Sequence, residues 1–225
     1  MSPASDELAM RNAVVSTACA MNAQNINRGK SGNVSARWRR EGIDGYLITP
    51  TGMAYADTTD ADIVAMPLEG DECHAIGRCL PSSEWRFHRD IYRARGEISA
   101  IVHTHAPFAT TLACLDRGIP PFHYMIAIAG GRDIRCAPYA TFGTQALSDH
   151  AVAALAGRLA CLLSHHGMIA CGATLDQALA LAVEVETLAE MYWRALQIAE
   201  PALLSDDEMV VVLEKFRRYG QSPKR

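Results

Sequence analysis

Two histidines lie one residue apart in the run SAIVHTHAPF, residues 99–108, which is otherwise mostly apolar. Residues i and i+2 of a β-strand project from the same face, so a strand here would aim His103 and His105 together and Thr104 away. Two convergent imidazoles are half of a metal site. The alternative is that these are ordinary core or surface histidines, because an H-x-H pair by itself is a weak signal.

A third imidazole is available in LLSHHGMIAC, where His165 and His166 end another apolar segment just before Gly167. Adjacent residues of a strand face opposite ways, so at most one of the two can join the first pair. The residues alone leave open which one that is, and they also allow both to be ordinary strand-end residues.

The segment LPSSEWRFH places a carboxylate beside two hydroxyl groups. We expect Glu84 in the first turn of a helix, directly after Ser82 and Ser83. The free N–H groups of a helix N-terminus suit an anion such as phosphate, and a carboxylate beside it could act on the bound molecule. The alternative is a surface glutamate that complements the helix dipole.

Two further loops, GKSGNVS at residues 29–35 and TPTG at 49–52, are candidates for phosphate contact. The triplet at 29–31 resembles the end of a P-loop, but Gln24 occupies the position of the motif's first glycine and a helix precedes the loop. A nucleotide site is therefore disfavoured, and a backbone nest for one phosphate is the interpretation that is left.

Helical and strand-like patterns alternate along the chain that must position these groups. The strongest helix pattern covers 174–199, which opens with a capping box from Thr174 to Gln177 and keeps an apolar stripe. Helices are predicted over about 5–22, 83–95, 107–118, 144–157, 174–199 and 205–220. Strands are predicted after residue 32 and near 46–49, 62–68, 98–105, 134–139 and 159–172. Together, these predicted elements indicate an α/β fold with a sheet covered by helices. The spacing of the strands along the chain does not determine their order in the sheet.

The 225 residues are 49% hydrophobic and 20% charged, which predicts a single globular domain over 1–225. A net charge of -4 gives no electrostatic reason to expect nucleic acid or an anionic membrane as partner. The polar start MSPASDELAM resembles no signal peptide, and no apolar run could span a bilayer. The seven scattered cysteines form no C-x-x-C pair. We therefore expect a cytoplasmic protein with reduced thiols.

Eight motifs occur in a fixed order: SGNVSAR, LITPTGM, LPSSEWRFH, VHTHA, FHYMIAIAGG, CAPYATFGT, HHGMIAC and LSDDEMVVVLEKF. The ordered set resembles the class II, zinc-dependent sugar-phosphate aldolases, most nearly the L-fuculose-1-phosphate aldolases of the aldolase class II/adducin-head superfamily. The likeness extends from the first helix to about Tyr219. It implies a single domain with a central, mainly antiparallel β-sheet and helices on both faces.

The resemblance also implies a metal site. The H-x-H histidines and the second histidine of H-H-G match the family's zinc ligands, which are here His103, His105 and His166. His165 is then a bystander. The expected cofactor is one Zn²⁺ per subunit, with Co²⁺ or Mn²⁺ as alternatives.

Further roles follow by position from the same resemblance. Glu84 matches the catalytic acid/base, and Tyr124 matches a tyrosine that exchanges a proton with the aldehyde-side oxygen. Tyr219 matches a C-terminal tyrosine that closes the site. In the family these tyrosines reach a neighbouring subunit, because the enzymes are homotetramers with sites at subunit interfaces. The substrate phosphate is expected to contact Asn33, Thr51, Gly52, Ser82 and Ser83, together with Lys30, which departs from the family's usual T-A-G-N loop.

The implied reaction is reversible aldol cleavage of a ketose 1-phosphate to dihydroxyacetone phosphate and an aldehyde. Substrates of this type are L-fuculose 1-phosphate and the 5-deoxy or 5-methylthio forms of ribulose 1-phosphate. The sequence does not identify the aldehyde, and segments 37–45 and 67–80 are longer than expected for the fuculose enzyme.

Three alternatives share the fold. A pentulose-phosphate 4-epimerase generally carries Asp at the position of Glu84, so the glutamate favours an aldolase. A methylthioribulose-phosphate dehydratase is the second alternative. An adducin-head-like interaction module is the third, and the presence of all three histidines and Glu84 argues against it.

Overall fold

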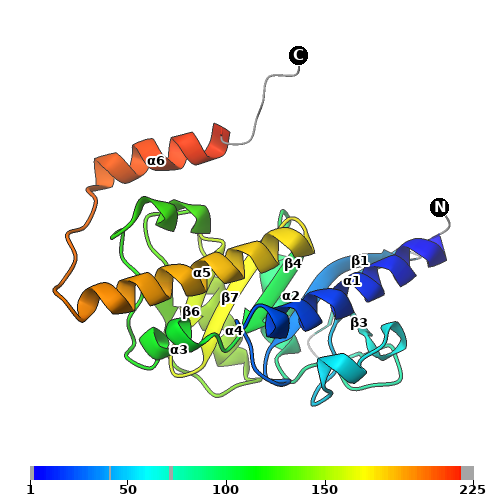
Figure 1. Ribbon diagram of the computed structural model, residues 1–225. Coiled ribbons are helices and arrows are strands. Elements are labelled where there is room, and N and C mark those ends of the chain that lie inside the picture. Colours follow the sequence, from blue (N-terminus) through cyan, green and yellow to red (C-terminus); the bar gives the residue numbers. More distant parts are fainter. Residues whose placement is uncertain (1–2, 41, 71–72, 219–225) are drawn as a thin grey trace.

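A seven-stranded sheet forms the centre of the described chain, which comprises residues 3–40, 42–70 and 73–218 of the computed structural model (Figure 1). Neighbouring strands are antiparallel except β5 and β6, which run parallel. The mainly antiparallel sheet is therefore confirmed. The strand order is β3-β2-β1-β4-β7-β6-β5. The strands are β1 (Asn33–Arg40), β2 (Ile43–Ile48), β3 (Val64–Pro67), β4 (Ala100–Thr104), β5 (Arg135–Ala137), β6 (Ala160–Leu163) and β7 (Gly167–Gly172).

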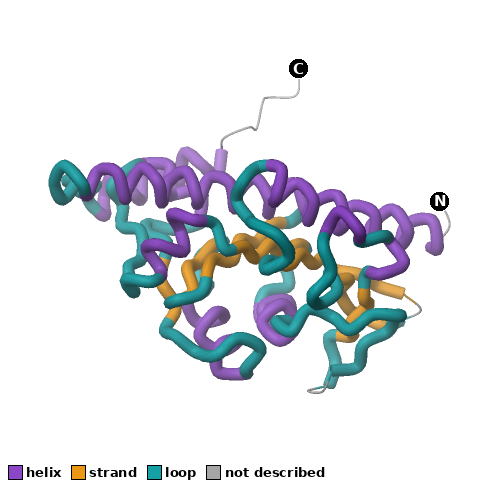
Figure 2. The backbone as a smooth tube through the Cα atoms, turned by 60° about the horizontal axis from the view of Figure 1, so that its bottom comes forward, coloured by secondary structure: helices purple, strands orange, loops and turns teal. Residues whose placement is uncertain are grey.

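Helices cover both faces of this sheet, as Figure 2 shows by the strands lying between two helical layers. Each α-helix overlaps a segment predicted to be helical. They are α1 (Pro3–Ala23), α2 (Trp85–Ala94), α3 (Pro107–Ala113), α4 (Gln145–Ala154), α5 (Leu175–Leu196) and α6 (Asp206–Arg218). The sequence patterns did not predict the short 3-10 helices η1 (Tyr55–Asp57), η2 (Asp60–Asp62) and η3 (Tyr124–Ala129).

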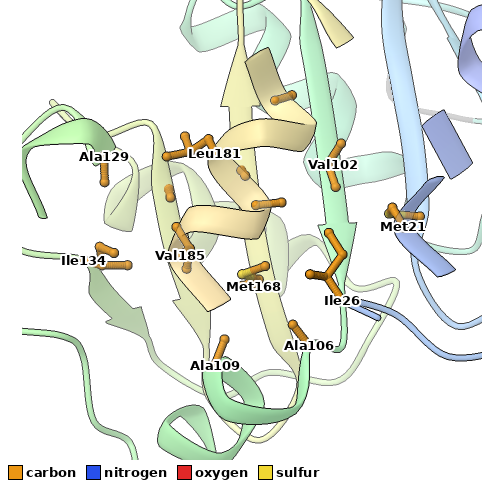
Figure 3. Packing of buried hydrophobic residues seen from close by; sticks show 14 of the residues in the cluster. Met21, Ile26, Val102, Ala106, Ala109, Ala129, Ile134, Met168, Leu181 and Val185 are labelled. Atoms are coloured by element: carbon orange, nitrogen blue, oxygen red, sulfur yellow. The ribbon is translucent and has the colours of Figure 1, made fainter. Parts of the chain in front are cut away.

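Strand alternation divides the buried side chains into two cores. Ala100 and Val102 of β4 belong to the core against α1, α3 and α5 (Figure 3), whereas Ile101 belongs to the core against α2 and α4. His103 follows Ile101 by two residues and therefore projects from the same face of β4, so its ring lies on the side of the sheet that α2 covers. Thr104 points the other way and donates a hydrogen bond to a carbonyl in the loop after α1. This confirms that Thr104 is the spacer of the H-x-H pair.

The helix α2 begins at Trp85, two residues later than the pattern predicts. Glu84 is therefore the residue before the helix rather than part of its first turn. The hydroxyl of Ser82 accepts a hydrogen bond of 3.3 Å from the Glu84 N–H, which holds the Ser-Ser-Glu segment in a turn. The Glu84 side chain is consequently buried beside His103 of β4 instead of exposed on the helix surface.

A half-buried carboxylate fixes the chain immediately after the H-x-H pair. Glu186 of α5 accepts hydrogen bonds of 2.8 Å from the backbone N–H groups of both Phe108 and Ala109, which begin α3. The first N–H groups of a helix have no partner within the helix, so this side chain from a distant segment caps α3. Because α3 starts two residues after His105, the cap also fixes the direction in which the chain leaves the histidines.

We expect Glu186→Ala to lower the free energy of unfolding by about 1–3 kcal/mol, because it leaves two part-buried N–H groups without an acceptor. Urea unfolding of the purified protein measures this. Glu190→Ala is the control on the same helix, since Glu190 pairs with Arg194 at the surface and such pairs contribute about 0–1 kcal/mol. Equal losses in the two variants would show that Glu186 is not a significant cap.

Candidate metal centre

Three imidazoles converge at the end of β4. His103 ends the strand's α2 face, His105 follows the strand, and His166 lies in the turn between β6 and β7. Their ring centroids are 4.9 to 5.0 Å apart in all three pairs, with interplanar angles of 75° each. Their candidate ligand nitrogens lie within 4.8 Å of one another. Three rings arranged in this way can share one ion as ligands of a tripod.

The turn between β6 and β7 selects His166 over its neighbour. His165 adopts a left-handed backbone (φ 52°), which turns the following residue back toward β4. A Cβ on Gly167 would lie 2.5 Å from the carbonyl oxygen of Thr104, so only glycine lets the turn approach β4 this closely. The His165 side chain is 53% exposed and lies 3.9 Å from Asp116 instead. The structure thus brings together the three histidines that the family resemblance implied.

The hydrogen bond of His103 fixes its tautomer. Its Nδ1 lies 2.9 Å from the carbonyl oxygen of Met168, which can only accept, so Nδ1 carries the hydrogen and Nε2 presents a lone pair. That Nε2 lies 3.2 Å from Nε2 of His105 and 3.0 Å from Oε2 of Glu84. The lone pair of His103 therefore faces other acceptor atoms, and a cation bound at this point would provide the positive charge that they lack.

The Glu84 carboxylate supplies the second sign of a cation site. It is 5% exposed, and Oε1 makes no hydrogen bond to any residue that the structure describes. Oε1 lies 3.1 Å from Nε2 of His166, and Oε2 accepts a hydrogen bond of 2.9 Å from the amide of Asn33. A buried acceptor without a donor is costly, whereas a divalent metal on the three nitrogens would compensate its charge. The residues therefore fit a metal ion.

Electrostatics keep the Glu84 carboxylate charged and favour the neutral form of the His105 ring. Burial raises the pKa of Glu84, but the charge interactions and hydrogen bonds with His103 and His166 lower it by a larger amount. The net effect holds this pKa well below its usual range, so the carboxylate is ionised. Burial, together with His103 and His166, lowers the pKa of His105 to about 4. A neutral imidazole and an ionised carboxylate are the forms that bind a metal.

The predicted phosphate contacts gather beside this centre from three loops. Residues Pro50 and Pro81 form an isolated β-bridge, which sets the T-P-T-G turn against the L-P-S-S turn. The Lys30 ammonium donates a hydrogen bond of 2.7 Å to the carbonyl oxygen of Gly52. Thr51 and Ser83 are exposed. Ser82 is buried, with its hydroxyl accepting from the Glu84 N–H, and the Asn33 amide contacts Glu84 rather than open solvent.

A cavity of about 250 Å³ opens onto His105, His166 and Glu84. Ser31 and Ser83 line its polar side. The sequence interpretation gave no role to the loop between β5 and α4, whose Tyr139 and Phe142 also line the cavity and are 59% and 65% exposed. Both residues belong to the motif CAPYATFGT, but the order of the motifs along the chain does not predict which side chains of a motif line the cavity.

A family model described as Class II Aldolase and Adducin N-terminal domain matches residues 12–193. The chain belongs to this class II aldolase family. It is 55% identical over 215 residues to a Rhodospirillum rubrum protein named 5-methylthioribulose-1-phosphate/5-deoxyribulose-1-phosphate aldolase, a match that covers 96% of this chain and 94% of that protein. It is 50% identical over 208 residues to L-fuculose phosphate aldolase of Escherichia coli strain K12, with 92% and 94% covered.

Solved structures agree with this assignment. A structure named L-fuculose 1-phosphate aldolase superposes with a TM-score of 0.86 at 38% identity, covering 92% of this chain and 96% of the other. Another from Thermus thermophilus, named l-fuculose-1-phosphate aldolase, has a TM-score of 0.70 at 28% identity, covering 86% and 98%. Close relatives of this chain are thus named aldolases, and the class is metal-dependent, in keeping with the three-histidine cluster.

Tyr124, which is expected in a class II aldolase site, does not line the histidine cavity described above. It lies in η3, is 52% exposed and lines a separate groove with Phe216 of α6. Tyr219 lies outside the described residues, so its role stays a prediction. Among the helices that the structure describes, we find none with the length and apolar character needed to cross a membrane.

Neighbouring histidines offer a matched test of the metal centre. We expect His166→Ala to reduce bound metal from about one ion per chain to less than a tenth, because it removes one of three ligands. His165→Asn is the control, since Asn tolerates the left-handed backbone of that position. Metal analysis after dialysis measures both variants. Retention of metal by His166→Ala, or loss by His165→Asn, would contradict the assignment.

Proposed function

We propose that this class II aldolase cleaves a ketose 1-phosphate reversibly to dihydroxyacetone phosphate and an aldehyde, with Zn²⁺ held by His103, His105 and His166. The observation that carries the proposal is the convergence of these three rings on the buried, ionised Glu84. Three neutral imidazoles leave a divalent ion its charge and an open coordination position, as a catalytic site needs. Co²⁺ and Mn²⁺ are the alternative ions.

The metal, when bound, supplies Lewis-acid stabilisation of the substrate oxygens at the reacting carbons. Glu84 is the chain's own proton carrier at this point, because its carboxylate is ionised and faces the same cavity as the histidines. In the direction of synthesis it takes a proton from the hydroxymethyl carbon of dihydroxyacetone phosphate. In the direction of cleavage it returns that proton after the carbon–carbon bond has broken.

The loops around Lys30, Thr51–Gly52 and Ser82–Ser83 support a phosphate seat beside Glu84. The Pro50–Pro81 bridge and the contact of Lys30 with Gly52 hold these loops together before any substrate binds. Hydroxyl, backbone N–H and ammonium donors suit a phosphate dianion. A phosphate fixed there orients the reacting carbons toward the histidines, which contributes through positioning rather than chemistry.

The exposed Tyr124 supports the proposal of a homotetramer with active sites between subunits. In this chain Tyr124 lies away from the histidine cavity, on the groove between η3 and α6. A tyrosine that exchanges a proton with the aldehyde-side oxygen must then reach the site of a neighbouring subunit. Tyr219 follows directly after α6 in the sequence, and we propose that it closes over the same neighbouring site.

The aromatic rim of Tyr139 and Phe142 bears on the choice of aldehyde. Both side chains are more than half exposed and line the histidine cavity. Contact with an apolar rim stabilises a bound 5-methylthio or 5-deoxy substrate more than a more polar one, because more apolar surface is removed from water. The relative from Rhodospirillum rubrum is named for those two substrates. We therefore place 5-methylthioribulose 1-phosphate and 5-deoxyribulose 1-phosphate ahead of L-fuculose 1-phosphate.

Product analysis separates this proposal from its alternatives. Incubation of the zinc-loaded protein with the three ketose 1-phosphates is expected to release dihydroxyacetone phosphate. An epimerase would give an isomeric sugar phosphate, a dehydratase would release water and keep the carbon chain, and an adducin-like module would give no product. Any of these three outcomes would overturn the proposal.

We expect Glu84→Gln to keep its metal and to lose about 10²–10⁴-fold in kcat, because the amide cannot carry the proton. Glu97→Gln is the control, since Glu97 is a surface carboxylate paired with Arg95. Steady-state kinetics and metal analysis are measured on the same preparations. Loss of metal with residual turnover in Glu84→Gln would assign Glu84 a structural role instead.

We expect Phe142→Ala to lower kcat/KM about tenfold for the 5-methylthio substrate and less for the 5-deoxy substrate, because the larger apolar tail loses more contact area. Dihydroxyacetone phosphate release measures both. Equal losses for the two substrates would show that Phe142 does not contact the aldehyde portion.

A further inference from the structure

A polar seam runs between α2 and β1, directly behind the proposed proton carrier. Glu84, His88 and Tyr92 recur every four residues, and Asn33 and Ser35 recur every two residues on the facing strand. Four helical residues advance about 6 Å and two strand residues about 6.6 Å, so the two series stay in step. The side chains consequently meet one by one along the seam.

His88 is at the centre of this seam and has no role in the proposed chemistry. It is fully buried and lies between Asn33 and Ser35, with its Nε2 hydrogen-bonded to Oδ1 of Asn33 and its Nδ1 2.7 Å from the hydroxyl of Ser35. The Ser35 hydroxyl in turn lies 2.8 Å from the hydroxyl of Tyr92. At the other end, the amide of Asn33 donates to Oε2 of Glu84 over 2.9 Å.

The chemistry of the end groups fixes the direction of the central hydrogen bonds. The Glu84 carboxylate only accepts, so the amide nitrogen of Asn33 must face it and the amide oxygen must face His88. An amide oxygen also only accepts, so Nε2 of His88 carries a hydrogen. With Nε2 protonated in a neutral ring, Nδ1 accepts from Ser35, which leaves the Ser35 oxygen to accept from Tyr92.

We infer that His88 is a positioning residue, which holds the Asn33 amide in the one orientation that donates to Glu84. An asparagine amide is nearly symmetric in shape, so packing alone does not select between its two flipped orientations. In the flipped orientation the amide oxygen would face the carboxylate, which would repel it. The Asn33 bond to Oε2 leaves Oε1 as the carboxylate oxygen without a donor among the described residues. This inference rests on the proposed role of Glu84.

His88→Phe and His88→Gln test the inference on the zinc-loaded full chain. Phenylalanine fills the ring volume but offers no donor, so we expect kcat to fall about 10–100-fold while KM changes less than about threefold and metal content is unchanged. Glutamine can donate to Asn33 and accept from Ser35, so His88→Gln should recover most of kcat. Full kcat in His88→Phe, or equal loss in both variants, would overturn the inference.

Tyr46→Phe is the matched structural control. Tyr46 is also fully buried against α2, and its hydroxyl donates to the carbonyl oxygen of Trp85 over 2.9 Å, outside the seam. Loss of this hydroxyl should lower the free energy of unfolding and leave kcat within about twofold of the value for the unmodified protein. A fall in kcat equal to that of His88→Phe would show that any weakening of α2 is sufficient, which would contradict a specific role for His88.

A double-mutant cycle and a spectroscopic measurement complete the test. If His88 acts through Asn33, adding His88→Phe to Asn33→Ala should change kcat less than about twofold, whereas additive losses would overturn the inference. Nitrogen-15 NMR of labelled histidine, with His88 assigned by its absence from His88→Gln, should show the neutral Nε2–H tautomer. An Nδ1–H tautomer would also overturn it. The tautomer needs no substrate, so failure of the proposed reaction is distinguishable from failure of this inference.

Discussion

A partly buried cluster of three imidazoles and a carboxylate is the constraint on which the rest of this structure depends. Three imidazole nitrogens and one carboxylate lie close together at the end of β4. Nδ1 of His103 gives its hydrogen to a backbone carbonyl, so its Nε2 presents a lone pair to this cluster. Such a cluster is stable only with a cation or with dense hydrogen bonding behind it. Residues of β1 and α2 supply the hydrogen bonds behind the cluster. The three histidine nitrogens and the Glu84 carboxylate provide the place for a cation.

Close backbone approach is what makes this cluster geometrically possible. A Cβ on Gly167 would collide with β4, and one on Gly32 would lie 2.5 Å from the carbonyl oxygen of His103. The strand that carries the H-x-H pair is therefore enclosed by glycine on two neighbouring segments. Glu186 then fixes the exit of the chain toward α3. Packing requirements at a few small or capping residues thus set the positions of the metal-binding rings.

The residues proposed for catalysis and those proposed for substrate preference line the same cavity but belong to different parts of the fold. The histidines and Glu84 lie on or beside the sheet, where hydrogen bonds fix the orientation of His103 and Glu84. The aromatic residues Tyr139 and Phe142 lie on the loop before α4 and are more than half exposed. Loops of this kind can change without disturbing the core, whereas sheet residues cannot. On the proposed function, the preference for an aldehyde can therefore change through this loop while the metal centre is kept.

The sequence by itself indicated the α-helices, the approximate strands and the family, because periodicity and ordered motifs can be recognised without the fold. Through the family resemblance it also indicated His103, His105 and His166 as the metal ligands. Only the tertiary structure decided the strand order, the backbone turn that brings His166 beside the other two histidines, and the partners of Asn33 and His88. Those outcomes depend on the left-handed backbone of one residue and on contacts between segments more than 50 residues apart. The spacing within each segment is visible in the sequence, but it does not show which distant segment lies opposite, so these partners could not be predicted from it.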